Sequence, residues 1–157
     1  MAIRNIVQLG DDVLRKKSAE VKEFDSKLIT LLNDMADTLI KANGAGLAAP
    51  QVGVLKRVFI IFDDNNQIIE FINPKIVKAK GTQTGVEGCL SVKGSNGKCK
   101  YGTVQRFLSV DVIAQNRYGE PFRCKAKGFM ARAIQHENDH LDGIIYIDKA
   151  TDVKEDV

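Results

Sequence analysis

His136 and His140 are the only histidines in this chain of 157 residues, and they lie four positions apart. On an α-helix this spacing places one imidazole a turn above the other, so both can bind one metal ion. Glu137 follows His136 directly, where its carboxylate can take a proton from a water molecule on the metal. A short His-Glu-x-x-His match also arises by chance on a polar helix. The metal interpretation is favoured because the motif contains every histidine of the chain.

A catalytic metal site of this kind uses three protein ligands and keeps one position open. After His140 the chain offers carboxylates but no further histidine. Asp142 lies on the same helical turn and cannot easily converge on the ion, so a distant cysteine is the better candidate for the third ligand. The chain has three cysteines and no Cys-x-x-Cys pair, and their odd number argues against a disulfide framework. They are Cys89, Cys99 and Cys124.

The composition predicts one domain over residues 1–157 that can bury its own core, because 44% of the residues are hydrophobic. A net charge of +3 is too mild to indicate nucleic-acid binding or a membrane surface. We find no apolar run of about 18 residues and no secretion leader, so we expect neither a membrane span nor export. The expected protein is cytoplasmic and, without a sign of an extensive apolar patch, monomeric.

Three helices are predicted from apolar residues that recur every three or four positions and from residues that favour helix ends. A short one covers residues 13–17, a long amphipathic one follows Asp25, and the last carries both histidines. The residues expected at their ends are Asp11, Asp12, Asp25, Asn43, Gly44, Gly128 and Gly143.

Strands are predicted between the second and third helices, at 57–62, 68–72, 76–80, 107–112 and 121–127. Asn73-Pro74 should stop the second strand, residues 93–102 should form a polar loop, and 116–119 should form a hairpin turn. Because no helix separates these strands, a parallel sheet is excluded. We expect an α+β domain in which antiparallel or mixed strands wrap around a central C-terminal helix that carries the His-Glu-x-x-His motif.

Three segments together resemble the signature motifs of the peptide deformylase family. They occur in the family's order and at compatible separations, and the resemblance covers nearly the whole chain. The segments are Gly44-x-Gly46-Leu47-Ala48-Ala49-x-Gln51, Glu87-Gly88-Cys89-Leu90-Ser91 and Gln135-His136-Glu137-x-Asp139-His140-Leu141-x-Gly143.

The resemblance implies that Cys89, His136 and His140 hold one divalent metal ion. In the family this is typically ferrous iron, and zinc, nickel or cobalt suits the same ligands. The implied substrate is a nascent peptide that begins with N-formylmethionine, and its hydrolysis releases formate. Glu137 would act as general base and then acid, while the Gln51 side chain and the Leu90 backbone N–H would stabilise the oxyanion.

Further positions carry over from the same resemblance. The methionine slot and the backbone that receives the peptide as an added strand would be formed by Ala45, Gly46, Gly88, Phe129, Ala133 and His136. Glu87 would pair with Arg106, while Gln135 and Asp139 would orient the histidines and the loop around Cys89. The chain departs from the family pattern at Lys93, at Arg132 and in a longer loop over 93–102.

Longer family members carry a C-terminal helix that docks near the ribosomal exit tunnel, whereas residues 148–157 here form a partly acidic tail. We therefore expect weak or differently routed transient contact with the ribosome, and no direct nucleic-acid specificity. Two other functions stay open. One is a small metallopeptidase that cuts internal peptide bonds, and the other is a zinc-stabilised binding domain with Cys99 or Cys124 as a fourth ligand.

Overall fold

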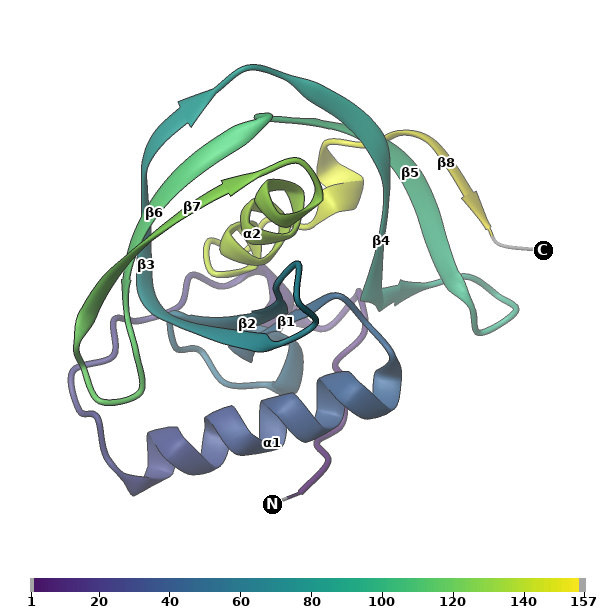
Figure 1. Cartoon of the computed structure of the whole chain (residues 1–157). Coiled ribbons are helices and arrows are strands. Elements are labelled where there is room, and N and C mark those ends of the chain that lie inside the picture. Colours follow the sequence, from purple (N-terminus) through teal and green to yellow (C-terminus); the bar gives the residue numbers. More distant parts are fainter. Residues whose placement is uncertain (1, 156–157) are drawn as a thin grey trace.

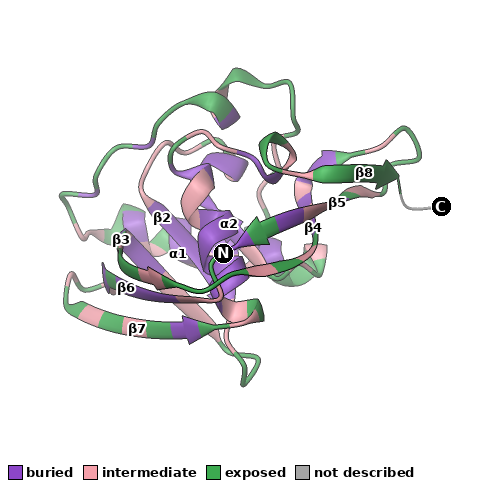
Figure 2. Cartoon of the chain, turned by 90° about the horizontal axis from the view of Figure 1, so that it is seen from above, coloured by how far each residue is buried: buried purple, intermediate pink, exposed green. Residues whose placement is uncertain are grey.

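The structure, a computed structural model that describes residues 2–155, is an α+β fold in which two antiparallel sheets surround one helix. That helix is α2, Phe129–His140, and the second long helix, α1, Ser26–Ala42, lies outside the larger sheet (Figure 1). Figure 2 shows α2 as a largely buried element in the middle of the molecule. The predicted fold class is thus confirmed. Asp156 and Val157 of the predicted tail lie outside the described residues.

The larger sheet has the strand order β1-β2-β3-β6-β7 and the smaller one β4-β5-β8. The strands are β1 Gly46–Ala48, β2 Val58–Phe62, β3 Ile68–Lys80, β4 Gln83–Lys93, β5 Cys99–Arg106, β6 Ser109–Gln115, β7 Pro121–Lys127 and β8 Thr151–Glu155. Short 3-10 helices are η1 Asp12–Arg15, η2 Ala49–Val52 and η3 Tyr146–Asp148. Of the described helices, none has the length and apolar character needed to cross a membrane.

Strand β2 is buried on both faces, which explains why its sequence is apolar throughout rather than alternating. Phe59 and Ile61 pack into the cluster that contains α2, while Val58 and Ile60 pack into the cluster that contains α1. The two clusters place α1 and α2 on opposite faces of the same sheet, and burying both faces holds α2 in a fixed position.

The caps predicted for α1 are confirmed. The Asp25 carboxylate accepts a hydrogen bond from the Leu28 N–H at 3.1 Å, which satisfies a donor that the first helical turn leaves unpaired. Asn43 ends the helix in the left-handed conformation, with φ of 57°. This turn directs the chain into β1 and fixes where the segment enters the site.

The prediction that Asn73-Pro74 ends a strand is wrong. β3 runs through both residues and joins the two predicted strands, with a shift of register against β6 between Ile72 and Lys75. Asn73 has φ of 51°, and its side chain bonds both backbone groups of Val21 and the side chain of Gln115. A bulge therefore accommodates the proline, which has no N–H to donate to a regular ladder.

Other boundaries also differ from the sequence prediction. Residues 99–102 belong to β5 rather than to a loop, and the chain after Lys149 forms β8, which pairs with β5. The first short helix is of the 3-10 type and begins at Asp12, and α2 ends at His140, before Gly143. The hairpin turn at 116–119 and the strand at 121–127 are confirmed.

We expect Asn73→Ala to lower the free energy of unfolding by about 2 kcal/mol, because three hydrogen bonds lose their partner at a half-buried bulge. Urea denaturation measures this loss. Asn66→Ala is the matched control, since Asn66 also has positive φ, 61°, in an exposed turn. Equal losses in the two variants would show that backbone strain, rather than the side-chain bonds, explains the effect.

Candidate active site

The metal-ligand candidates come from two elements that meet at the centre of the molecule. His136 and His140 lie one turn apart on α2, with ring centroids 5.2 Å from each other, and Cys89 reaches them from β4. The ligand atoms of these three buried residues lie within 4.8 Å of one another. The Cys89 Sγ is 3.4 Å from Nε2 of His140. This is the size of group that one metal ion can bind.

The group comprises three residues within the part of the chain that the structure describes, and neither Cys99 nor Cys124 belongs to it. Cys124 lies on β7 and packs against the main core. Cys99 lies on β5 at the wall of the neighbouring pocket. A closed site with a fourth cysteine is therefore not supported. Three ligands beside an open pocket are instead typical of a catalytic metal site.

The electrostatics of the group suit a cation. Burial lowers the pKa of His136, but Glu137, Cys89 and Glu87 raise it more strongly, so that it lies well above its usual value. Burial lowers the pKa of His140 well below its usual value, and this ring stays neutral. A thiol, a carboxylate and a neutral imidazole thus surround one point that attracts positive charge. The residues present fit a divalent metal ion.

The Glu87 carboxylate connects the two elements that carry the ligands. Its Oε1 lies 2.8 Å from Nδ1 of His136, and both of its oxygens accept hydrogen bonds from Arg106, at 2.8 and 2.9 Å. Burial raises the pKa of Glu87, but the hydrogen bonds from Arg106 and His136 lower it to about 2. Because Nδ1 of His136 donates to this carboxylate, its Nε2 is left to face a metal ion.

Arg132 contributes to the site although its sequence position only marked it as a departure from the family pattern. Its Nη1 lies 2.5 Å from Oε2 of Glu87 and also donates to the Val104 carbonyl oxygen at 3.0 Å. The residue is 6% exposed. The sequence did contain one indication of this role: Arg132 lies four residues before His136, which places its charged side chain on the same buried face of the helix.

The other supporting residues lie behind the ligands. Asp139 accepts a hydrogen bond from Arg106 at 2.7 Å and pairs with Lys149 at 3.0 Å. The Gln135 amide binds the backbone N–H and carbonyl of Phe107, at 3.0 and 2.9 Å. Gln135 therefore ties α2 to the segment after β5, and the hydrogen bonds of its side chain go neither to a histidine nor to the loop around Cys89.

Tyr146, on η3, closes the far side of the site. Its ring stacks on that of His136 with centroids 5.9 Å apart, and its hydroxyl donates to the Lys100 carbonyl oxygen at 2.7 Å. Burial raises the pKa of Tyr146 to about 12. The phenol therefore stays protonated and keeps the His136 ring in place by contact.

The Glu137 carboxylate lines the pocket and lies 4.0 Å from Nε2 of His136, whereas Glu87 contacts Nδ1 of the same ring. Glu137 is buried, and burial raises its pKa to about 7. Its Oε1 has no hydrogen-bond partner among the described residues. Gly46 passes so close that a β-carbon there would lie 2.8 Å from Oε2, so only glycine fits at this position without a shift. A carboxyl group with one unpaired oxygen and a pKa near neutrality is suited to proton transfer.

The Gln51 side chain has a fixed orientation beside Cys89. Its Oε1 accepts from the Ala48 N–H at 2.9 Å, so the amide nitrogen must point the other way. That nitrogen lies 3.0 Å from the Ser91 hydroxyl and 3.5 Å from the Cys89 sulfur. The amide thus presents a donor at the edge of the ligand group.

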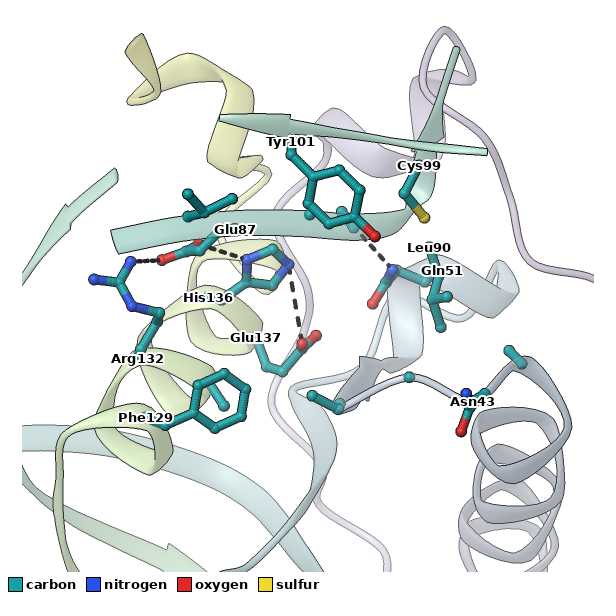
Figure 3. Close-up of a pocket in the computed structure, with 18 residues that line it drawn as sticks. Asn43, Gln51, Glu87, Leu90, Cys99, Tyr101, Phe129, Arg132, His136 and Glu137 are labelled. Atoms are coloured by element: carbon teal, nitrogen blue, oxygen red, sulfur yellow. Dashed lines mark hydrogen bonds and ion pairs between the residues drawn. The ribbon is translucent and has the colours of Figure 1, made fainter. Parts of the chain in front are cut away.

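A pocket of about 440 Å³ opens beside these residues, between β1, β4 and α2 (Figure 3). Most of the residues predicted for the site line it, whereas His140, Arg106, Gln135 and Asp139 lie behind its wall. Those that line it are Ala45, Gly46, Gln51, Glu87, Gly88, Cys89, Leu90, Phe129, Ala133, His136 and Glu137. Sequence reasoning did not find the part of the wall that Asn43, Val86 and Tyr101 form.

We expect Arg132→Leu to weaken zinc binding by about 10- to 100-fold, because Glu87 then holds His136 with one arginine fewer. Competition with a chelator measures the zinc affinity directly. Arg117→Leu is the control, since it removes another arginine–glutamate pair, with Glu70, away from the pocket. Unchanged zinc affinity in a folded Arg132→Leu protein would show that Arg106 alone suffices.

Comparison with known proteins gives one consistent result. Residues 3–156 match the family model described as polypeptide deformylase. A peptide deformylase of Caldicellulosiruptor bescii is 51% identical over 149 residues, which are 95% of this chain and 86% of that protein. The crystal structure of a peptide deformylase from Legionella pneumophila has a TM-score of 0.88 at 44% identity, over 96% of this chain and 88% of that one.

A crystal structure from Thermotoga maritima gives a TM-score of 0.89 at 36% identity, over 96% of this chain and 99% of that one. Sequence and structure therefore agree along nearly the whole length of these proteins. The chain belongs to the polypeptide deformylase family, the metallohydrolases that remove the formyl group from the amino terminus of nascent peptides.

Proposed function

We propose that Cys89, His136 and His140 hold one divalent metal ion in this deformylase and that Glu137 transfers the protons of the reaction. The observation that carries the proposal is the convergence of a thiol, two imidazoles and a buried carboxylate at one end of the pocket. When bound, the ion lowers the pKa of a water molecule and polarises the formyl oxygen. Ferrous iron is the proposed ion, and zinc, nickel or cobalt suits the same ligands.

Glu137 acts twice in this scheme. Its carboxylate first accepts a proton from the attacking water, and it then donates that proton to the departing amine as the carbon–nitrogen bond breaks. One water is consumed, and formate and a free amino terminus are released. The raised pKa of Glu137, about 7, allows both steps near neutral pH.

Two donors stabilise the oxyanion that develops on the formyl group. These are the side-chain amide of Gln51, whose nitrogen is oriented by the Ala48 and Ser91 contacts, and the backbone N–H of Leu90. Both residues line the pocket beside Cys89. Fixed donors at this point act on the transition state more strongly than on the substrate, because the charge develops there.

The peptide is proposed to lie between the edges of the two sheets. β1 is the first strand of the larger sheet and β4 the first strand of the smaller one, and the pocket lies between them. Gly46 and Gly88 then present backbone groups to an extended chain, as in strand addition. Ala45, Phe129 and Ala133 form the slot for the methionine side chain.

The remaining features of the proposal concern the whole protein. Residues 1–157 act as one catalytic domain and as a monomer in the cytoplasm, where nascent peptides appear. Contact with the ribosome is transient. This contact involves no C-terminal helix in the part of the chain that the structure describes, because the chain after Lys149 forms the exposed strand β8. Because the chain belongs to the deformylase family, the two alternative functions, a metallopeptidase and a zinc-stabilised binding domain, are no longer favoured.

The reaction and its general base are tested by formate release from a formyl-methionyl peptide, with protein purified without oxygen. We expect Glu137→Ala to retain its metal and to lose about 10²- to 10⁴-fold in kcat, because the proton acceptor is missing. Glu20→Ala, which removes an exposed carboxylate, should leave kcat unchanged. Full activity in the metal-loaded Glu137→Ala protein would exclude the proposed role.

The pH dependence follows from the same carboxylate. Only the ionised form of Glu137 can accept a proton, so kcat/KM should fall on acidification as one group with a pKa of about 7 or below becomes protonated. A bound cation shifts this fall in kcat/KM to lower pH, because positive charge stabilises the ionised carboxylate and lowers its pKa. A pH profile of kcat/KM provides the measurement, and a rate that rises on acidification through this range would contradict the assignment.

A further inference from the structure

The outer face of the larger sheet, away from α2, is strongly basic near the β7 edge. Along β7, Ala126 packs into the core with α2, while Arg123, Lys125 and Lys127 alternate with buried or half-buried positions and point outward. On β3, the register shift between Ile76 and Lys78 keeps Lys78 and Lys80 on the same outer face. Figure 2 shows β7 at the rim of the molecule with exposed stretches along it.

The strand register aligns these side chains in rows. Lys78 and Lys125 both pair with Asp111 of β6, one from each side. Lys80 and Lys127 pair with Ser109 in the same way. Since directly paired residues project from the same face of a sheet, each row carries two lysines separated by one strand. Successive rows are about 6.8 Å apart along the strands.

The rows border a hollow of about 350 Å³ on this face. The residues that line it include five basic side chains and one acidic one: Lys78, Lys80, Arg123, Lys125, Lys127 and Asp111. Asp111 already pairs with Arg123, through one hydrogen bond of 2.8 Å and a second, shorter one. The hydrogen bond from Arg123 lowers the pKa of Asp111, and the charges of Lys125 and Lys78 lower it further. The face is thus positive even though the chain carries only +3 overall.

We propose that this basic face binds the phosphate backbone of an RNA helix. Two lysines per row and a short repeat between rows match the regular, closely spaced charges of a nucleic-acid strand. Phosphate contacts of this kind fix position without reading sequence, which agrees with the expectation of no direct nucleic-acid specificity. An enzyme that acts on nascent peptides works beside ribosomal RNA, so such a surface would hold it close to its substrates.

The composition of the face favours a nucleic-acid backbone over an acidic protein or a membrane surface. Lysine is depleted in protein–protein interfaces, whose centres are apolar or aromatic. The aromatic residue of β7, Phe122, turns inward and packs against Phe71 instead of offering an anchor to a membrane. The exposed large apolar side chains of β3 and β6 are Val77 and Ile113, and neither is aromatic.

The position of the face leaves the catalytic pocket accessible. β7 and β1 are the two opposite edges of the larger sheet, and the pocket lies beside β1. A bound RNA helix at β7 would therefore not cover the entrance used by the peptide, and changes at this face should leave the hydrolysis of short peptides unaffected.

The test is fluorescence anisotropy with a short labelled RNA duplex and the metal-loaded protein. We expect the logarithm of the association constant to fall linearly with the logarithm of the salt concentration. The slope should be about four to five, because five basic groups contact phosphates. In the double variant Lys80→Glu, Lys127→Glu the affinity should fall about tenfold or more and the slope by about two. The matched control is Lys22→Glu, Lys27→Glu, which makes the same change of net charge at exposed lysines outside the hollow.

The control should bind RNA nearly as well as the parent, and all three proteins should release formate from a short formyl-methionyl peptide at equal rates. Equal loss of RNA binding in both double variants would overturn the proposal, because the effect would then reflect net charge alone. Absence of binding by the parent at low salt would also overturn it. So would tighter binding to phosphatidylserine vesicles or to poly-glutamate than to RNA, which would assign the face to a membrane or to an acidic protein.

Discussion

The rest of the structure depends on the ion pairs that the buried carboxylate of Glu87 forms. It comes from β4, and its partners are Arg106 from β5 and both Arg132 and His136 from α2. Removing a charge from water is costly unless every lone pair finds a donor, and here the donors are themselves charged or polarised. The same contact therefore sets the distance between the smaller sheet and the helix and orients the ring of His136. Loss of the carboxylate would leave the buried guanidinium group of Arg132 without its carboxylate partner, whereas Arg106 would keep Asp139.

The two sheets have different tasks around α2. Strand β2 of the larger sheet buries apolar residues on both faces, and the cluster on its inner side, where Phe59 stacks on Phe71 at 4.7 Å, packs against the helix. The smaller sheet has no residue in that cluster but brings Cys89. Its residue Arg106 bonds to Asp139 of α2, and Gln135 of α2 bonds to the backbone of Phe107 directly after β5. Apolar packing thus fixes the helix, while directional hydrogen bonds fix the angle at which the thiol approaches it. The pocket beside Cys89 and His136 lies between β1, at the edge of the larger sheet, and β4, at the edge of the smaller one.

The sequence was most informative where a residue acts through local geometry. The four-residue spacing of His136 and His140 and the cap at Asp25 depend only on a helix, so both could be predicted. The bulge at Asn73 could not, because its side chain is satisfied by Val21 and Gln115, which lie far away in the sequence. β8 was missed for a similar reason. All its described residues are exposed, and only pairing with β5 makes it a strand, so no apolar alternation marks it. The role of Arg132 likewise needed the position of Glu87 in space.

The position of Tyr146 beside His136 has a consequence for the fluorescence of the protein. The chain contains no tryptophan, three tyrosines and seven weakly emitting phenylalanines, so tyrosine dominates its ultraviolet emission. Tyr118 is 71% exposed, whereas the ring of Tyr146 stacks on His136. A paramagnetic ion bound at that imidazole would quench the buried phenol by its proximity and leave Tyr118 bright, while a closed-shell ion such as zinc would not. The proposed metal site would thereby have an intrinsic, label-free reporter of the kind of ion bound there.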